Sequence, residues 1–316
     1  MLVSVLLLVA GFALLIIGAG MLVDGASSLA SRFGISELVI GLTVVAFGTS
    51  LPELTVNSFN SVNGLNDAVV GNVIGSNIFN TMFILGFVGL IYPIIVNKRS
   101  VAFEIPLSIA ITILLLILAN DRIWGASDAM LRRPDAFILI CIFGSFVFYI
   151  FKYANFPSEK EEVKRKSVSK TVLLIISGTI LLVAGGYQVT NSAVEIAEIF
   201  GMSQKLIALT VLSIGTSLPE LATSAIAAFR KNTDIAVGNV IGSNIFNIAF
   251  ILGISTFIHP IQYNIILNTD IYILLFGSLV LFIGMFTGGK LKLDRWEAAI
   301  LFGSYIIYTI YIINRN

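Results

Sequence analysis

Two glutamates lie inside long apolar stretches, at matching places in two copies of one motif. Glu53 belongs to Gly48-Thr-Ser-Leu-Pro-Glu-Leu54, and Glu220 belongs to Gly215-Thr-Ser-Leu-Pro-Glu-Leu221. A charged side chain at the centre of a membrane-spanning helix costs about 2.5–3.5 kcal/mol on insertion scales. A buried acid with a purely structural role is the simpler interpretation, but the symmetric placement argues against it. Because glutamine is cheaper to bury, the pair indicates a cation partner.

A proline precedes each of these glutamates. Pro52 and Pro219 remove a backbone donor and clash with the preceding helical turn, so we expect each helix to bend or open there. Carbonyl oxygens near Ala46 and Ser213 should then be satisfied by a neighbour, by water or by an ion.

Further oxygen-bearing residues follow the same helical spacing. Residues three or four apart share one helix face, and the two motif stripes are Ala46, Thr49, Ser50 and Glu53, and Ser213, Thr216, Ser217 and Glu220. Two later pairs with this spacing are Ser76 with Asn80, and Ser243 with Asn247. Such hard oxygen ligands, without imidazole or thiolate, suit Ca²⁺ and also Na⁺. Two plainer roles stay open: hydroxyls can bond back to the preceding turn, and the asparagines can tie helices together.

The motifs belong to an internal repeat. Gly71-Asn-Val-Ile-Gly-Ser-Asn-Ile-Phe-Asn80 recurs letter for letter from Gly238 to Asn247, and both motifs keep one offset of 167 residues. Glycines, a threonine and a proline outside the motifs keep the same offset. The chain therefore consists of a duplicated unit.

The composition indicates that these helices lie in a membrane. Hydrophobic residues make up 57% of the 316 residues and charged residues only 12%, which is typical of a bundle of membrane-spanning helices. The near-balance of 19 basic and 18 acidic residues implies no nucleic-acid partner. The single cysteine, Cys141, excludes an intrachain disulfide. We interpret the apolar N-terminus as a retained first helix, because it has no basic region before it.

Ten apolar stretches are long enough to cross roughly 30 Å of hydrocarbon. They lie near residues 2–23, 36–61, 68–95, 102–119, 135–151, 170–189, 205–229, 235–257, 270–287 and 296–313. We therefore predict an all-α integral membrane protein with ten transmembrane helices. Its first repeat spans residues 1–151 with a motif region at 43–80, a cytoplasmic linker spans 152–169, and the second repeat spans 170–316 with a motif region at 210–247.

Five helices per repeat force the second copy to enter the membrane from the opposite side, which gives an inverted-topology repeat. The loops agree with this. The turn after the second helix, 62–67, has no basic residue, whereas its counterpart after the seventh carries Arg230 and Lys231. Over the whole chain, five of the 19 basic residues fall on one side and fourteen on the other. Basic residues accumulate on the cytoplasmic side, so both termini are predicted to be extracellular or periplasmic, in a plasma or inner membrane.

At these motifs the chain resembles the Ca²⁺/cation antiporter superfamily, and specifically its prokaryotic Na⁺/Ca²⁺ exchanger branch. The paired Gly-Thr-Ser-Leu-Pro-Glu and Gly-Ser-Asn-Ile-Phe-Asn segments look like the two α-repeats of that family, and the resemblance covers essentially the whole chain. It implies ten helices in two inverted halves, with the ions bound between the repeats. It also implies Glu53 and Glu220 as shared acidic ligands, threonines at the Ca²⁺ site, serines at flanking Na⁺ sites and backbone carbonyl ligands at Ala46 and Ser213.

One position departs from the family pattern. Related exchangers often carry Asp where this chain has Asn247, which leaves two obvious acids in the pocket. This departure puts K⁺ dependence in doubt and leaves the Na⁺:Ca²⁺ ratio open. The proton-coupled branch typically has Gly-Asn-Ala-x-Glu at the first motif, so the hydroxyls here favour Na⁺ coupling.

The resemblance therefore implies an antiporter, not an enzyme, that exchanges Na⁺ for Ca²⁺ by alternating access. We also predict that the protein needs no cofactor beyond the transported ions, lies in the lipid bilayer and functions as a monomer. A Ca²⁺/H⁺ antiporter on the same fold is the nearest alternative, and a cation channel is a remote one. An intramembrane protease is disfavoured, because the sequence has no His-Glu-x-x-His and its one histidine lies at a helix end.

Overall fold

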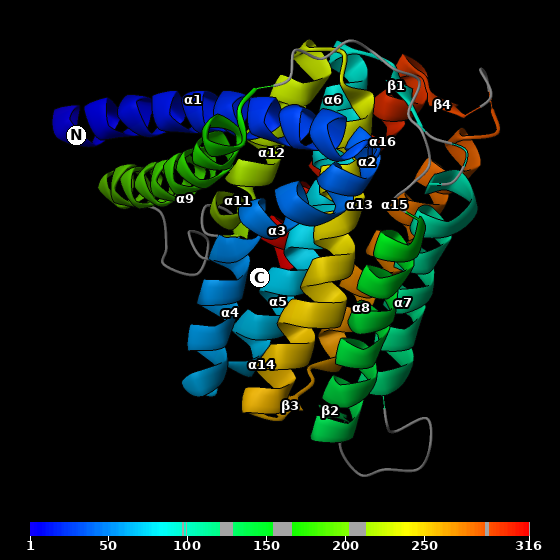
Figure 1. Ribbon diagram of the computed structural model, residues 1–316. Helices are drawn as coiled ribbons and strands as arrows, with labels where there is room; N and C mark the ends of the chain where they lie inside the picture. The colour runs from blue at the N-terminus through cyan, green and yellow to red at the C-terminus, as the bar shows by residue number, and fades with distance from the viewer. Residues whose placement is uncertain are drawn as a thin grey trace.

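The computed structural model describes residues 1–96, 98, 100–120, 129–153, 166–201, 213–287 and 291–315, and within these ranges the chain is almost entirely helical (Figure 1). The first half contains α1 (Leu2–Phe33), α2 (Glu37–Ile40), η1 (Gly41–Val45), α3 (Ala46–Thr49), α4 (Leu51–Val62), α5 (Asn66–Ile78), η2 (Phe79–Ile84), α6 (Leu85–Ile91), η3 (Ser100–Glu104), α7 (Ile105–Ala119) and α8 (Arg133–Tyr153). The second half contains α9 (Val168–Ile199), α11 (Ser213–Thr216), α12 (Leu218–Phe229), α13 (Thr233–Ile245), η6 (Phe246–Leu252), α14 (Gly253–Ile258), η7 (Ile265–Leu267), α15 (Asn268–Gly284) and α16 (Arg295–Arg315).

Eight of the described helices are long and apolar enough to cross a membrane. They are Leu2–Phe33, Asn66–Ile91, Ser100–Ala119, Arg133–Lys152, Val168–Ile199, Thr233–Ile258, Ile265–Gly284 and Arg295–Arg315. A bent pair, Glu37–Thr49 with Leu51–Val62, raises the number to nine if it is one span. The chain is thus a multi-pass membrane protein. The seventh predicted span, 205–229, falls partly on residues 202–212, outside the described residues, and its described part is the shorter apolar helix α12.

The two longest helices, α1 and α9, lie side by side across the rest of the molecule (Figure 1). Each has 32 residues, so the predicted ends near residues 23 and 189 were wrong by about ten residues. The small and apolar residues after Asp24 continue the first helix until Gly34, whose φ of 66° ends it. A helix of this length measures about 48 Å, more than the hydrocarbon thickness, and therefore must incline.

Glycines allow α1 and α9 to pack closely. We call Gly11, Gly18, Gly25, Gly178 and Gly185 the glycine seam, because on both helices these residues recur every seven positions and face the partner. A Cβ atom on Gly18 would lie 2.8 Å from the Gly178 carbonyl oxygen, and one on Gly185 would lie 2.9 Å from the Gly11 carbonyl oxygen. Small residues of this kind let membrane helices approach backbone to backbone.

The helices that carry the glutamates break where the prolines predicted. Between α3 and α4 the chain leaves helical geometry at Ser50, with φ −86° and ψ 9°, and the two parts meet at a bend of 48°. The second copy shows the same break at Ser217, with φ −91° and ψ 8°, between α11 and α12. The predicted bend is confirmed in the first copy, and it has the same local cause in both.

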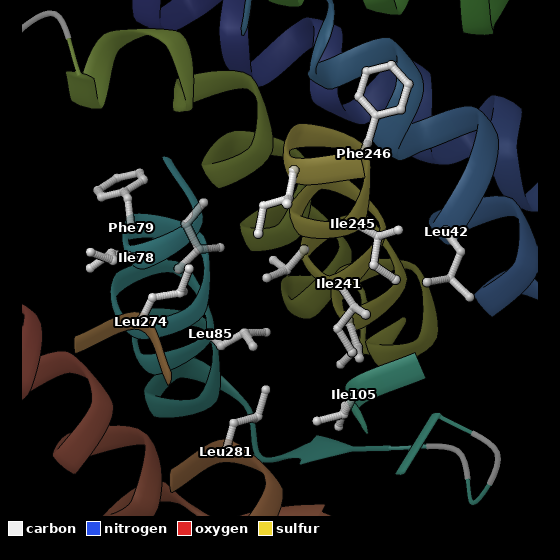
Figure 2. Packing of buried hydrophobic residues seen from close by; sticks show 14 of the residues in the cluster. Leu42, Ile78, Phe79, Leu85, Ile105, Ile241, Ile245, Phe246, Leu274 and Leu281 are labelled. Atoms are coloured by element: carbon white, nitrogen blue, oxygen red, sulfur yellow. The ribbon is translucent and has the colours of Figure 1, made fainter. Parts of the chain in front are cut away.

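The centre of the molecule is formed by α5–η2 and α13–η6. Every residue of α13 from Ile235 to Ile245 is buried, as expected of a helix surrounded by other helices. Figure 2 shows Ile78 and Leu85 on one side, with Ile241 and Ile245 on the other, among leucines of neighbouring helices. Both central helices widen into π-helical turns, η2 and η6, which begin just before Asn80 and Asn247. Such widened turns occur frequently at functional sites.

Two small antiparallel sheets close opposite ends of the bundle. Strand β1 (Ile94–Ile95) pairs with β4 (Lys292–Leu293), and β2 (Met130–Leu131) pairs with β3 (Ile261–Gln262). Strand β3 follows β1 at the repeat offset of 167 residues. The first sheet lies at the top of Figure 1 and the second at the bottom, so equivalent parts of the two repeats lie at opposite ends of the molecule.

Candidate cation-binding site

The two glutamates face each other's repeat near the middle of the molecule. Glu53 and Glu220 each lie in the first turn of their helix, α4 or α12, where the helix dipole favours a negative charge. Both are fully enclosed, with exposed fractions of 1% and 0%. The Ser217 hydroxyl donates to Glu53 Oε1 at 3.0 Å, and the Ser50 hydroxyl donates to Glu220 Oε1 at 2.8 Å. Each carboxylate is therefore held by the serine of the opposite copy.

One serine of the central helices joins this arrangement and its counterpart does not. Ser243 Oγ lies 3.0 Å from Ser50 Oγ and 3.4 Å from Glu220 Oε1, which completes a triangle around that carboxylate. The equivalent Ser76 is fully buried, and its hydroxyl has no hydrogen-bond partner. The hydrogen bonds of these two serines therefore differ, although the motifs around them are identical.

The threonines also bond across the repeats. Thr49 donates to Asn239 Oδ1 at 3.0 Å, and Thr216 donates to Asn72 Oδ1 at 3.3 Å. Thr49 also lies 3.3 Å from the Ala46 carbonyl oxygen, the local contact that the simpler interpretation of a membrane hydroxyl requires.

The two site asparagines behave differently from each other. Asn247 Nδ2 donates to Asn77 Oδ1 at 3.0 Å, and Asn77 Nδ2 donates to the Asn244 carbonyl at 3.1 Å, so this chain of amides does tie α5 to α13. Asn80 is fully buried, but neither its oxygen nor its nitrogen has a hydrogen-bond partner. Joining helices therefore accounts for Asn247 in part and does not account for Asn80.

Of the two predicted carbonyl ligands, only Ala46 lies well inside a described segment. The Ala46 carbonyl accepts a backbone bond from Ser50 at 3.0 Å. The sequence suggested that Pro52 would leave this carbonyl without a partner, and that expectation was wrong. The carbonyl can offer an ion only its second lone pair. Ser213 is the first residue of α11, directly after residues 202–212, which the structure does not describe.

Among the predicted ligands, five buried side-chain oxygens lack any hydrogen-bond partner. They are Oε2 of Glu53, Oε2 of Glu220, Oγ of Ser76, Oδ1 of Asn80 and Oδ1 of Asn247. Leaving a buried polar atom unsatisfied costs about 1–3 kcal/mol, and more for a charged group. Four of the five atoms can only accept a hydrogen bond when the carboxylates are ionised. A cation that coordinates them would remove this cost.

The donor set is that of an oxygen site. Within the described ranges, no three His, Cys, Asp or Glu side chains gather closely enough to hold a metal ion, and no ion pair with Lys or Arg is recorded there for Glu53 or Glu220. Two carboxylates with hydroxyl and amide oxygens fit Ca²⁺ or Na⁺ and do not fit a zinc centre.

Several polar residues of the site are not among the predicted ligands but hydrogen-bond the backbone beside them. Asn57 Nδ2 donates to the Glu53 carbonyl at 2.8 Å, and Asn239 Nδ2 donates to the Glu220 carbonyl at 3.3 Å. Asn72 and Asn239 lie inside the ten-residue segment that recurs letter for letter, which was the available signal. Asn57 stands one helical turn after Glu53 and has Ser224 as its counterpart, so the repeat gave no indication of it.

Comparison with known proteins identifies the relatives of this chain. The family model described as sodium/calcium exchanger protein matches residues 3–152 and 170–314. The putative antiporter CaxA of Alkalimonas amylolytica is 37% identical over 319 residues, which cover 98% of each chain. The sodium/calcium exchanger MaX1 of Methanosarcina acetivorans is 30% identical over 346 residues, again 98% of each chain.

Solved structures show the same fold at full length. The sodium-calcium exchanger NCX_Mj, soaked with 2.5 mM Na⁺ and 0.1 mM Ca²⁺, matches with a TM-score of 0.83 at 30% identity, and the match covers 97% of each chain. Because the family model, the relatives and this structure all cover nearly the whole sequence, the chain belongs to the sodium/calcium exchanger protein family.

Proposed function

We propose that this protein exchanges Na⁺ for Ca²⁺ by alternating access at a site centred on Glu53 and Glu220. The observation that carries the proposal is the pair of buried carboxylates, each with one oxygen bonded to a serine of the other repeat and one oxygen without a partner. The remaining site ligands would be Thr49, Thr216, Ser50, Ser217, Ser76, Ser243, Asn80, Asn247 and the carbonyls of Ala46 and Ser213. The names of the relatives and of the matching structure support Na⁺ and Ca²⁺ as the transported ions.

The charge of the pocket explains why such a site exchanges ions instead of leaking them. Two ionised carboxylates without a cation are costly to enclose in a medium of low dielectric constant. One Ca²⁺ or a set of Na⁺ ions neutralises them, so only the loaded site can pass through an occluded state. The moving part would be the pair α1 and α9, whose close contact at the glycine seam supports motion of the two as a unit.

The proposed topology has ten transmembrane helices in two inverted five-helix repeats, with both termini on the extracellular or periplasmic side. The position of the two small sheets at opposite ends of the bundle supports an inverted arrangement of the repeats. The reciprocal hydrogen bonds between serines and glutamates support it too. The tenth span would be residues 205–229. All proposed ligands come from a single chain, which supports a functional monomer that is a transporter and not an enzyme.

Uptake of ⁴⁵Ca²⁺ into proteoliposomes tests the proposal. Vesicles are loaded with Na⁺ and diluted into medium with or without Na⁺, while valinomycin and K⁺ clamp the voltage. We expect uptake only with an outward Na⁺ gradient, and none in vesicles that carry Glu53→Gln or Glu220→Gln. The voltage dependence of uptake then reports whether net charge moves.

The alternatives predict different results in the same vesicles. Uptake driven by a pH jump in the absence of Na⁺ indicates a Ca²⁺/H⁺ antiporter on this fold and contradicts Na⁺ coupling. Ca²⁺ flux without any counter-ion, with single-channel currents in planar bilayers, indicates a channel and contradicts exchange altogether.

A further inference from the structure

A hydroxyl group binds a cation through an oxygen lone pair, so its hydrogen must point elsewhere. The structure provides an acceptor for this hydrogen at each site threonine. We propose that Asn239 and Asn72 are positioning residues, each of which accepts the hydroxyl hydrogen of the threonine from the opposite repeat and so turns that oxygen's lone pairs toward the ion. This inference rests on the proposed cation site and assigns a role to two residues outside its ligand set.

The contacts of Asn239 determine which way its amide faces. Its nitrogen lies 3.3 Å from the Glu220 carbonyl oxygen, which can only accept a hydrogen bond, and 3.0 Å from Ser224 Oγ. The amide oxygen must therefore face Thr49 Oγ1, which lies 3.0 Å away. Thr49 has a single hydrogen to donate and Asn239 Oδ1 can only accept it, so the direction of this bond is unambiguous.

Without Asn239, the Thr49 hydroxyl retains two alternative acceptors, the Ala46 carbonyl and the Glu220 carboxylate, both of which belong to proposed ligands. The Ala46 carbonyl lies 3.3 Å from Thr49 Oγ1, farther than Asn239 Oδ1. Ala46 is itself a proposed ligand, so a hydrogen bond from Thr49 would occupy the lone pair that is meant for the ion. Asn239 thus preserves two ligands, the threonine oxygen and the Ala46 carbonyl. It also joins the first repeat to the backbone of Glu220, because the same amide holds both.

The repeat counterpart is built more loosely. Thr216 donates to Asn72 Oδ1 at 3.3 Å, and Asn72 Nδ2 is buried without a hydrogen-bond partner. The equivalent of the Glu220 carbonyl is the Glu53 carbonyl, and Asn57 Nδ2 already donates to it at 2.8 Å. Asn72 therefore lacks the two anchors that hold Asn239. We expect the Asn239 contact to contribute more to ion binding than the Asn72 contact does.

A double-mutant cycle separates positioning from a general structural role. We would prepare Asn239→Ala, Thr49→Val and the double variant as full-length protein, and measure the apparent Ca²⁺ affinity from ⁴⁵Ca²⁺ uptake and from Ca²⁺-dependent thermal stabilisation in detergent. Loss of one such hydrogen bond predicts that Asn239→Ala weakens Ca²⁺ binding about fivefold. In the Thr49→Val background the same substitution should change it less than about twofold, because the interaction is already lost.

The repeat supplies the matched control. Asn72→Ala should weaken Ca²⁺ binding less than Asn239→Ala does, and its effect should multiply with that of Thr49→Val because the two do not touch. Ser224→Ala removes an anchor of Asn239 without touching a proposed ligand, and it should weaken binding only when Thr49 is present. This variant also carries the test if Asn239→Ala does not fold.

Two results overturn the inference. One is an unchanged Ca²⁺ affinity in a folded Asn239→Ala protein, and the other is full additivity of Asn239→Ala with Thr49→Val. Failure of the proposed function gives a different result, because Ca²⁺ uptake by the wild-type protein would then not depend on the Na⁺ gradient. Thermal stabilisation by Ca²⁺ still tests the positioning role in that case.

Discussion

Ser50 donates a hydrogen bond of 2.8 Å to Oε1 of Glu220, although 170 residues separate them in the chain. Its repeat counterpart, from Ser217 to Glu53, is 3.0 Å long. The break in each helix points its serine at the carboxylate of the other copy. The two repeats therefore build one site jointly, and neither half holds a complete set of contacts.

Removing either negative charge should abolish exchange. Glu53→Gln or Glu220→Gln keeps the size of the side chain but leaves a single charge to balance Ca²⁺, and we expect ⁴⁵Ca²⁺ uptake to fall about 100-fold or more. Glu195→Gln makes the same change at an exposed residue of α9 and serves as the control. Full transport by either site variant would refute the assignment of the carboxylates.

Ser76→Ala should separate stability from binding. The Ser76 hydroxyl is buried without a hydrogen-bond partner, so in the absence of Na⁺ its removal should leave the free energy of unfolding unchanged or raise it by about 1 kcal/mol. The same change should weaken Na⁺ binding, since the hydroxyl is a proposed ligand. Thermal unfolding in detergent, with and without Na⁺, measures both effects.

Ser50→Ala provides the contrasting case, because the Ser50 hydroxyl donates a hydrogen bond to the Glu220 carboxylate. We expect it to lower the free energy of unfolding by about 1.5–3 kcal/mol without ions, as is typical of hydrogen bonds to charged groups. Equal stability of the Ser50 and Ser76 variants would contradict the asymmetry seen in the structure.

A half-buried ion pair connects the last helix, α16, to α15. Two guanidinium nitrogens of Arg315 lie 3.1 Å from the carboxylate of Asp270, and the Tyr308 hydroxyl lies 3.2 Å from the same group. Asp270→Asn removes these charge-assisted hydrogen bonds, and the partly exposed Arg315 can then turn toward solvent, so we expect a loss of about 1.5–3 kcal/mol in stability. Thermal unfolding checks this prediction.

The control for that pair is Lys292→Gln, which breaks the surface pair with Asp294. Exposed pairs contribute about 0–1 kcal/mol, so the unfolding temperature should barely move. If the two variants unfold alike, the Arg315 contact does not stabilise the bundle as the geometry indicates.

The glycine seam predicts opposite effects of one substitution at two glycines. A Cβ atom on Gly18 would collide with the Gly178 backbone at 2.8 Å, so Gly18→Ala must push α1 and α9 apart and lower the unfolding temperature. Gly144 in α8 has nothing within 4 Å of such an atom, and there alanine should stabilise the helix by up to about 1 kcal/mol. A tolerated Gly18→Ala would show that the two helices separate readily.

The sequence correctly predicted an all-helical membrane protein and the bend in the first copy, but it misjudged the lengths of α1 and α9. A hydropathy argument counts apolar residues and so stops at Asp24, whereas the helix continues past it, with Gly25 and Ser28 in contact with α9, and ends only at Gly34. The Ala46 carbonyl was also misjudged, because it keeps the ordinary helical hydrogen bond from the Ser50 amide four residues later.

By itself, the sequence determined that the chain is a membrane protein, that it contains a duplicated unit and that its candidate ligands lie in repeated motifs. These features follow from composition, from the 167-residue offset and from local helical spacing, all of which are properties of the chain alone. Only the tertiary structure decided which serine meets which glutamate, and that Asn239 is anchored while Asn72 is not. Those contacts join residues more than 140 positions apart or depend on how neighbouring helices are oriented. Neither local helical spacing nor hydrophobicity determines them.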